Sequence, residues 1–249
     1  MSNDILPKAV EDAENQYCHV AHYSFVDKIH NKGGKDKRIL IITNVFIAFY
    51  KVKRVLTRDR TMYWPYLTNI TIVDNSFTIS FGDEKFQFET KDKDIVLQSI
   101  VSIIQRILPL SLIQTFTIPQ SCLNSNITPN SLGVVAKFLG ICYKTGHQKL
   151  NNSFQLLRKY LSHHETIFNF STSDLNQFIQ PLIQSLSQIT FCESLILPKL
   201  DKSATSKLFL FLSETSLPYL KHILIKSQIP EDFRSHISKL CQKADIALS

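Results

Sequence analysis

The spacing of apolar residues in the first ninety positions is typical of β-strands. In the stretch "RILIITNVFIAFY", residues 38–50, most residues are β-branched or aromatic, and the polar pair Thr43 and Asn44 interrupts them. This pattern predicts two paired strands, 38–43 and 45–52, with the polar pair in the turn. Alternation with period two predicts further strands in the segments 17–27, 61–74 and 75–90.

The period changes to that of a helix in residues 92–109. Val96, Ile100, Ile103 and Ile107 recur at helical spacing, and Pro109 prevents the helix from continuing. The first part of the chain is therefore predicted to consist of short strands closed by one helix. The following segment, 110–130, is rich in Ser, Asn, Thr and Pro and is predicted to be a linker with one extended piece.

A repeat begins near residue 165, after two predicted helices at 131–146 and 153–164. Pairs of apolar residues two positions apart recur at steps of 27 and 28 residues, and a helical pattern follows each pair. The pairs are Phe168 and Phe170, Leu195 and Leu197, and Ile223 and Ile225, and the segment "ADIAL" begins a partial fourth unit. A strand and a helix in this length are typical of ribonuclease-inhibitor-type leucine-rich repeats, whose units must stack to bury their apolar faces. The alternative is an unrelated α/β domain with coincidental spacing.

These patterns predict an α+β protein with two domains. An acidic lead, residues 1–15, precedes a domain of antiparallel strands with a closing helix at 16–109. A linker with helices, 110–164, joins it to the repeats at 165–249. No apolar run reaches the length of about 20 residues that a membrane-spanning helix needs.

Positive charge is concentrated in one segment. The chain carries a net charge of +7, but residues 28–60 alone carry ten Lys or Arg against two Asp, so the remainder is slightly negative. Two basic loops are predicted here, at 30–37 and 53–60. We interpret these cations as candidate lipid-binding residues: Lys28, Lys32, Lys35, Lys37, Arg38, Lys51, Lys53, Arg54, Arg58 and Arg60.

Several partners are compatible with such a segment. Anionic membrane lipid attracts each well-placed Lys or Arg by about 1 kcal/mol, which gives reversible, salt-sensitive contact. The alternatives are a solvated rim that keeps the protein soluble, or an acidic protein. Nucleic acid is disfavoured, because the interleaved aromatic and basic residues of an RNA-binding sheet are missing.

The order of the predicted elements resembles that of known families. Short antiparallel strands followed by one helix, over residues 16–109, resemble a pleckstrin-homology (PH) domain, in which basic loops at the open end of the barrel meet phosphoinositide headgroups. The segments "RILIITNVFIAFY", "FLGICYKTG" and "ETIFNFSTSDL" together resemble the amino-terminal half of the CARMIL family. This resemblance implies an actin-regulatory scaffold that associates peripherally with the membrane. The capping-protein motif of that family lies in a disordered tail and corresponds to no residue of this chain.

Candidates for catalysis and metal binding are weak. His163 and His164 are adjacent, so on a helix they diverge by about 100° and do not face one ion. Cys142 with His147 lacks the nucleophile elbow and the oxyanion-forming turn of a hydrolase. The same holds for Cys192 with Glu193, and "KGGK" at 32–35 has the wrong spacing for a phosphate-binding loop. We therefore predict no catalytic residue, no cofactor and no metal, and a hydrolase is a competing class.

Two further sets of residues are open to interpretation. Tyr63, Trp64 and Tyr66 could insert into a lipid interface, but packing in the core of the sheet is the favoured alternative. The strand positions Asn169, Ile196 and Leu224 are predicted to line the concave face of the repeats.

The sequence as a whole predicts a non-enzymatic adaptor. The five scattered cysteines and the acidic start without an apolar signal core indicate a cytoplasmic protein, peripheral at the plasma membrane or the cortical cytoskeleton. Its predicted partners are anionic lipid and cytoskeletal regulatory proteins. In the alternative function, the PH-like domain binds no lipid and serves packing or homodimer formation in a protein–protein scaffold.

Overall fold

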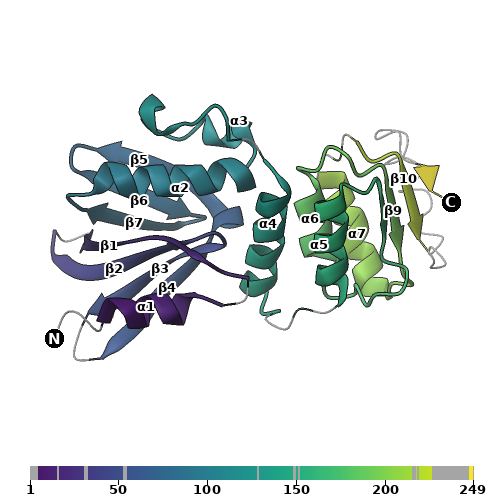
Figure 1. Ribbon diagram of the computed structural model, residues 1–249, viewed down its shortest axis with the longest axis horizontal. Helices are drawn as coiled ribbons and strands as arrows, with labels where there is room; N and C mark the ends of the chain where they lie inside the picture. Colours follow the sequence, from purple (N-terminus) through teal and green to yellow (C-terminus); the bar gives the residue numbers. More distant parts are fainter. Residues whose placement is uncertain are drawn as a thin grey trace. The chain divides into compact units, whose positions relative to one another are not determined.

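The computed structural model describes residues 5–15, 17–30, 33–52, 55–127, 129–147, 150, 152–214, 217, 219–225 and 247–248. The chain divides into two compact units, Met1–Pro129 and Asn130–Ser249, which are described separately (Figure 1).

The described part of the first unit contains a seven-stranded antiparallel sheet with the order β4-β3-β2-β1-β7-β6-β5. The strands are β1 (Val20–Ile29), β2 (Lys35–Thr43), β3 (Phe46–Val52), β4 (Leu56–Tyr63), β5 (Leu67–Val73), β6 (Ser76–Phe81) and β7 (Glu84–Glu89). The closing helix, α2 (Lys93–Ile107), follows β7. The predicted layout of antiparallel strands followed by a helix is therefore confirmed.

The predicted strand pair at 38–43 and 45–52 corresponds to β2 and β3. Thr43 fixes the turn between them, because its Oγ1 accepts hydrogen bonds from the backbone N–H groups of Val45 and Phe46 at 3.1 and 2.8 Å. Trp64, fully buried in the short 3₁₀ helix η1 (Trp64–Tyr66), donates from Nε1 to the carbonyl oxygen of Thr43 at 2.8 Å. The turn is thereby tied to the connection between β4 and β5.

The predicted basic loop at 53–60 is wrong from residue 56 onward. Residues 56–60 belong to β4, which pairs with β3 along its whole length. β4 is an edge strand of the sheet, and charged side chains are common on edge strands because they discourage pairing with other chains. The density of Arg and Asp in this segment therefore concealed a strand.

Aromatic side chains fill the core on the inner face of the sheet. The ring of Phe49 lies 5.1 Å from that of Phe86 and 4.9 Å from that of Phe88, measured between centroids. The apolar face of α2 is also buried, including Ile100 and Ile104. The core of the first unit thus lies between the inner face of the sheet and the closing helix.

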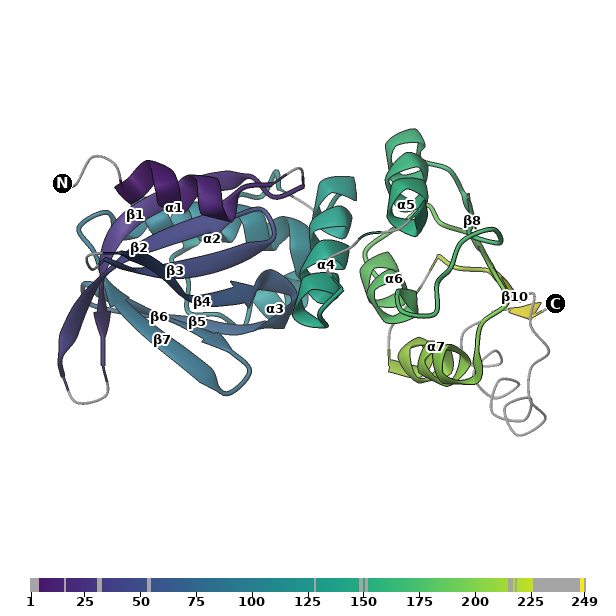
Figure 2. The same ribbon diagram turned by 90° about the horizontal axis from the view of Figure 1, so that it is seen from below.

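The outer face of the sheet is covered by α1 (Ile5–Ala13), which precedes β1 (Figure 2). Tyr50 lies on this face, since its hydroxyl donates to Oδ2 of Asp12 in α1 at 2.7 Å. The buried positions Ala9 and Ala13 of α1 allow the helix to approach β2 and β3 closely. β2 is therefore buried on both faces from Arg38 to Thr43.

Residues 110–127 remain attached to the first unit through short helices, α3 (Leu110–Ile113) and η2 (Gln120–Cys122). The side chain of Gln105 in α2 donates to the carbonyl oxygen of Asn124 and accepts from its N–H, at 3.0 and 3.2 Å. The N–H of Thr117 donates to the carbonyl oxygen of Ile70 in β5 at 2.9 Å. The Ser- and Asn-rich segment is thus bound at two places.

The described part of the second unit contains a parallel sheet with the order β11-β10-β9-β8 and helices packed beside it (Figure 1). Its elements are α4 (Ser131–Lys144), α5 (Asn152–His163), β8 (Ile167–Asn169), α6 (Ile179–Leu186), β9 (Ser194–Leu197), α7 (Lys202–Glu214), β10 (His222–Ile225) and β11 (Ala247–Leu248). The two helices predicted after the linker correspond to α4 and α5.

The strands of the second unit are in the register that the repeat predicts. Ile167 pairs with Ser194, which in turn pairs with His222, so neighbouring strands differ by 27 and 28 residues. The backbone hydrogen bonds repeat with the same step. The N–H groups of Glu193 and Ser194 donate to Thr166, and those of Lys221 and His222 donate to Glu193. The helical pattern predicted for the third unit, at 233–240, lies outside the described residues.

Candidate functional site

The candidate cations of the segment 28–60 lie on the first four strands. Lys28 belongs to β1, Lys51 to β3, and the others that the structure describes to β2 (Lys35, Lys37, Arg38) and β4 (Arg58, Arg60). The candidates Lys32, Lys53 and Arg54 lie outside the described residues.

Lys28, Arg38 and Lys51 converge on one carboxylate, that of Asp59. The Lys51 Nζ lies 2.9 Å from Oδ1 of Asp59, while the Lys28 Nζ and the Arg38 Nε lie 3.7 and 3.6 Å from Oδ2. These four residues, which we call the Asp59 cluster, come from four adjacent strands. Within the described chain, the cluster therefore holds three positive charges against one central negative charge.

Strand register explains the cluster. Arg38 pairs with Lys51 on one side and with Val26 on the other, so Lys28, two residues beyond Val26, shares their face. Phe49 pairs with Arg60 and Tyr50 with Arg58, which leaves Asp59 as the extra residue of a β-bulge. Since β1 and β3 end here and β2 and β4 begin here, the cluster lies at one end of the sheet, on the inner face.

Arg38 is the most buried member of the cluster. Its side chain is only 6% exposed, and its Nε has no hydrogen-bond partner although one terminal nitrogen contacts Asp36 Oδ2 at 3.0 Å. A buried N–H group without a partner is costly, and guanidinium groups are suited to bidentate recognition of carboxylate and phosphate oxygens. Arg38 is therefore prepared to donate a further hydrogen bond toward the centre of the cluster.

The carboxylates at this end of the sheet are held in the charged form. Burial by itself would raise the pKa of Asp59, but the hydrogen bond from Lys51 and the charges of Lys28, Lys51 and Arg38 outweigh it and lower the pKa. The pKa of Asp36 is also lowered, first by its hydrogen bond with His30 and then by that from Arg38. The excess positive charge of the site is therefore partly neutralised within the protein.

The other described cations do not join the cluster. Lys35 pairs with Glu89 of β7 at 2.6 Å. Arg58 lies on the outer face, where its Nε donates to Asp12 Oδ2 at 2.9 Å and its guanidinium stacks over the ring of Tyr50. Lys37 and Arg60 are exposed. The predicted set is thus divided between the two faces of the sheet.

The sequence gave no reason to single out Asp59. In "TRDR" it reads as one acidic residue among basic ones, and its central position depends on a β-bulge and on the pairing of four strands. The available signal was that Asp36 and Asp59 are the only acidic residues between positions 28 and 60. Such isolated carboxylates are candidates for internal counterions.

The aromatic residues near this segment belong to the fold. Trp64 is fully buried, and Tyr63 packs edge-on against Phe46 with ring centroids 6.0 Å apart. This geometry agrees with the core-packing alternative for Trp64 and Tyr63.

The second unit places its candidate residues in structural roles. Burial raises the pKa of the thiols of Cys142 and Cys192 to about 12, which disfavours the nucleophilic thiolate. His164 stacks on Phe191, with ring centroids 5.0 Å apart, while His163 approaches Glu165 at 3.9 Å. Among the residues described, no group of three or more His, Cys, Asp or Glu side chains could hold a metal ion.

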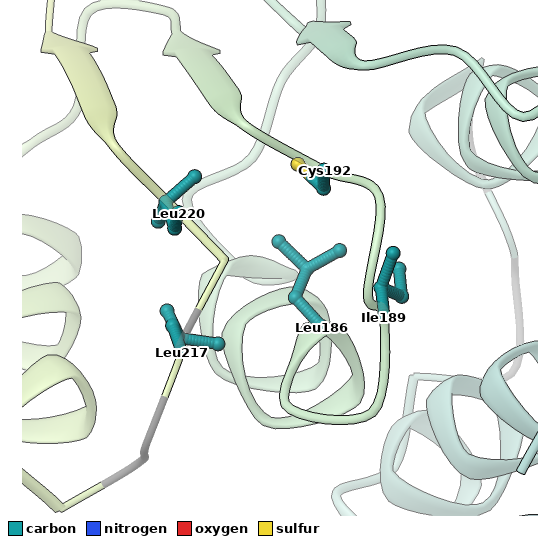
Figure 3. Close-up of a pocket in the computed structure, with 5 residues that line it drawn as sticks. All are labelled: Leu186, Ile189, Cys192, Leu217 and Leu220. Carbon is teal, nitrogen blue, oxygen red and sulfur yellow. The ribbon is translucent and has the colours of Figure 1, made fainter.

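A small pocket below the parallel sheet is too narrow for a ligand. Figure 3 shows Cys192 and four aliphatic side chains around it, those of Leu186, Ile189, Leu217 and Leu220. Its volume of about 10 Å³ is at the lower limit for a single water molecule. We interpret it as a packing gap of the second unit.

None of the helices in the described parts of the chain is both long enough and apolar enough to span a bilayer.

Comparisons with known proteins returned distant structural similarity. No protein-family model matches the sequence, and no curated protein matches it. Among solved structures, the N-terminal PH domain of human ARAP2 matches with a TM-score of 0.31 and 14% identity, over 45% of this chain and 95% of that domain. The Slm1 PH domain in complex with phosphoserine matches with a TM-score of 0.29 and 12% identity, over 34% and 91%. The C-terminal domain of a protein from Leishmania infantum matches with a TM-score of 0.34 and 10% identity, over 40% and 94%.

Proposed function

We propose that the first unit is a PH-like module that binds anionic headgroups at the Asp59 cluster, in a non-enzymatic adaptor. The observation that carries this proposal is the convergence of Lys28, Arg38 and Lys51 at one end of the sheet, with the Nε of buried Arg38 lacking a hydrogen-bond partner. An anionic group can satisfy that N–H and neutralise the excess charge. Contact with an anionic bilayer follows, at about 1 kcal/mol for each participating cation.

Vesicle sedimentation tests the proposal. The full chain should bind phosphatidylcholine vesicles that contain a phosphoinositide, and not phosphatidylcholine alone. The double variant Lys28→Gln, Lys51→Gln should lose about tenfold or more in affinity, from two lost charges.

The control is Lys202→Gln, Lys207→Gln, which removes the same charge from the exposed side of α7 in the second unit. If both double variants weaken binding equally, net charge and not the Asp59 cluster is responsible. If the full chain binds neutral vesicles as well, headgroup recognition is wrong.

For the second unit we propose a leucine-rich-repeat-type array that binds protein. In-register parallel strands at steps of 27 and 28 residues support it, as do backbone hydrogen bonds that repeat with the same step. Asn169, Ile196 and Leu224 align across the sheet, and Ile196 and Leu224 are half-buried. The resemblance to the CARMIL family extends this proposal to regulation of the actin cytoskeleton.

Localisation in cells tests that extension. In cells that express the full chain, Ile196→Asp should reduce colocalisation with cortical actin. Leu210→Asp, at an exposed position of α7, should not. Equal loss in both variants, or no cortical signal from the unmodified chain, would contradict the proposed role.

The alternative function is a protein–protein scaffold whose first unit binds no lipid. The observation that favours it is the internal pairing of the cations, since Asp59, Asp36 and Glu89 already contact Lys28, Lys35, Arg38 and Lys51. Failure of the full chain to bind any anionic vesicle would support this alternative.

A further inference from the structure

The carboxylate of Asp59 occupies the position where the cations of the cluster meet. It contacts side chains from β1, β2 and β3, and its own side chain is only 16% exposed. Asp36, the other carboxylate nearby, is 51% exposed and contacts Arg38 from the side of His30. Asp59 is therefore the acidic group that a ligand at the centre of the cluster would have to displace.

The contacts of Asp59 are unequal. Lys51 makes a close contact at 2.9 Å, whereas Lys28 and Arg38 remain at 3.7 and 3.6 Å, beyond hydrogen-bond distance. The Arg38 Nε consequently has no acceptor. One carboxylate thus fills the centre without satisfying every donor around it.

We infer that Asp59 is a built-in competitor that makes the site selective for headgroups carrying a phosphomonoester. This inference rests on the proposed function of the same site. A carboxylate carries one negative charge and two oxygens, whereas a phosphomonoester carries close to two charges and three acceptor oxygens at neutral pH. A phosphomonoester can replace Asp59 and also supply the acceptor that Arg38 lacks. A headgroup with a single net negative charge, such as that of phosphatidylserine, gains too little to displace the carboxylate.

The position of Asp59 on a β-bulge makes displacement feasible. The bulge residue is not paired across the ladder, because Arg58 and Arg60 make the contacts with β3 on either side of it. The side chain can therefore leave the centre without breaking the pairing of β3 and β4. We call this behaviour displacement of Asp59.

The variant Asp59→Asn tests the inference on the full chain. It keeps an acceptor oxygen for Lys51 but removes the competing charge, so affinity for phosphatidylserine vesicles should rise about fivefold, the equivalent of about 1 kcal/mol for one charge. Affinity for phosphoinositide vesicles of the same surface charge should rise less. The preference for the phosphomonoester lipid should therefore fall.

Asp74→Asn is the matched control. It makes the same change of charge in the β5–β6 turn, which lies at the opposite end of β6 from the β6–β7 turn beside the cluster end of β1. Its backbone has a φ of 48°, which Asn tolerates well. This control should leave both affinities unchanged within error.

The outcomes separate the two proposals. If the unmodified chain binds anionic vesicles through Lys28 and Lys51 but Asp59→Asn leaves the lipid preference unchanged, the inference is wrong and the proposed function stands. If neither protein binds anionic vesicles, both are wrong. A thermal unfolding curve for each variant shows whether it is folded.

A second measurement needs no variant. The ¹³C signal of the Asp59 carboxyl group is followed by NMR while soluble inositol trisphosphate is added to the unmodified chain. Displacement of Asp59 predicts a shift toward that of a solvated carboxylate. Ligand-induced changes at Lys28 and Lys51 with a constant Asp59 signal would overturn the inference. A shift in a protein that binds no vesicle would assign the site to soluble phosphates and overturn only membrane binding.

Discussion

Phe49 is the aromatic residue that joins the two halves of the first sheet. It lies on β3, is completely buried, and packs against Phe86 and Phe88 of β7. Its position illustrates how single side chains hold distant strands together, since β3 and β7 are separated by β2 and β1 in the sheet.

We predict that Phe49→Ala lowers the free energy of unfolding by about 3–5 kcal/mol, because it leaves a cavity between two rings. Phe25→Ala is the matched control, since Phe25 is 52% exposed on β1, and we expect a change within about 0.5 kcal/mol. Urea unfolding followed by fluorescence of Trp64 measures both. Equal destabilisation by the two substitutions would contradict the assignment of Phe49 to the core.

Residue-scale predictions from the sequence were accurate where period and burial coincide. The alternation at Phe77, Ile79 and Phe86 identified positions that are buried in β6 and β7. The role of Asp59 could not be read in this way, because it depends on which strands are neighbours. Spacing along the chain reports the face of a strand, but not the partner across the ladder.

At the scale of elements, α1 is held to the sheet by a polar contact as well as by its apolar face. Asp12 accepts hydrogen bonds from Tyr50 and Arg58, residues of β3 and β4. Burial alone would raise the pKa of Asp12, but the hydrogen bonds from Tyr50 and Arg58 and the charge of Arg58 lower it. The carboxylate form is therefore favoured in the folded protein relative to the unfolded chain.

The sign of the resulting pH dependence follows from this shift. A carboxyl group with a lowered pKa stabilises the fold above its unfolded pKa of about 3.9, and this contribution is lost as the pH falls through the folded value. We predict that Asp12→Asn costs less than about 1 kcal/mol at pH 7, because the side chain is 53% exposed, and that the difference disappears near pH 3. Unfolding at pH 7, 5 and 3 measures it.

Glu11→Gln is the control for this prediction, since Glu11 is an exposed neighbour on the same helix. A cost of Asp12→Asn that is constant with pH would mean that its charge does not hold α1 in place.

Element boundaries were predictable where the chain is apolar and were misread where it is charged. The pair β2 and β3 was found from "RILIITNVFIAFY", whereas β4, with Arg58, Asp59 and Arg60, was taken for a loop. Helical spacing located α2 to within a few residues. The physical reason is that an edge strand needs little apolar surface, so its pattern does not separate it from a solvated turn.

At the scale of the whole molecule, the chain has two cores that differ in the range of their contacts. The first unit pairs strands that are far apart in sequence, as when Asp27 of β1 pairs with Glu89 of β7. The second unit pairs each strand with the next at a constant step. This difference explains why the repeat was evident in the sequence, while the closure of the first sheet by β1 and β7 was not.

Because each unit has its own core, we predict that a core substitution acts mainly within its own unit. Phe88→Ala should reduce the protection of backbone amides against hydrogen exchange in β1, β6 and β7. Phe168→Ala, at a fully buried position of β8 where Tyr160 packs 5.1 Å away, should do so in β8 and β9. Mass spectrometry of the full chain after exchange measures both variants against the unmodified protein. Equal loss of protection in both units from either substitution would show a single cooperative core, and the division at residue 129 would then have no energetic meaning.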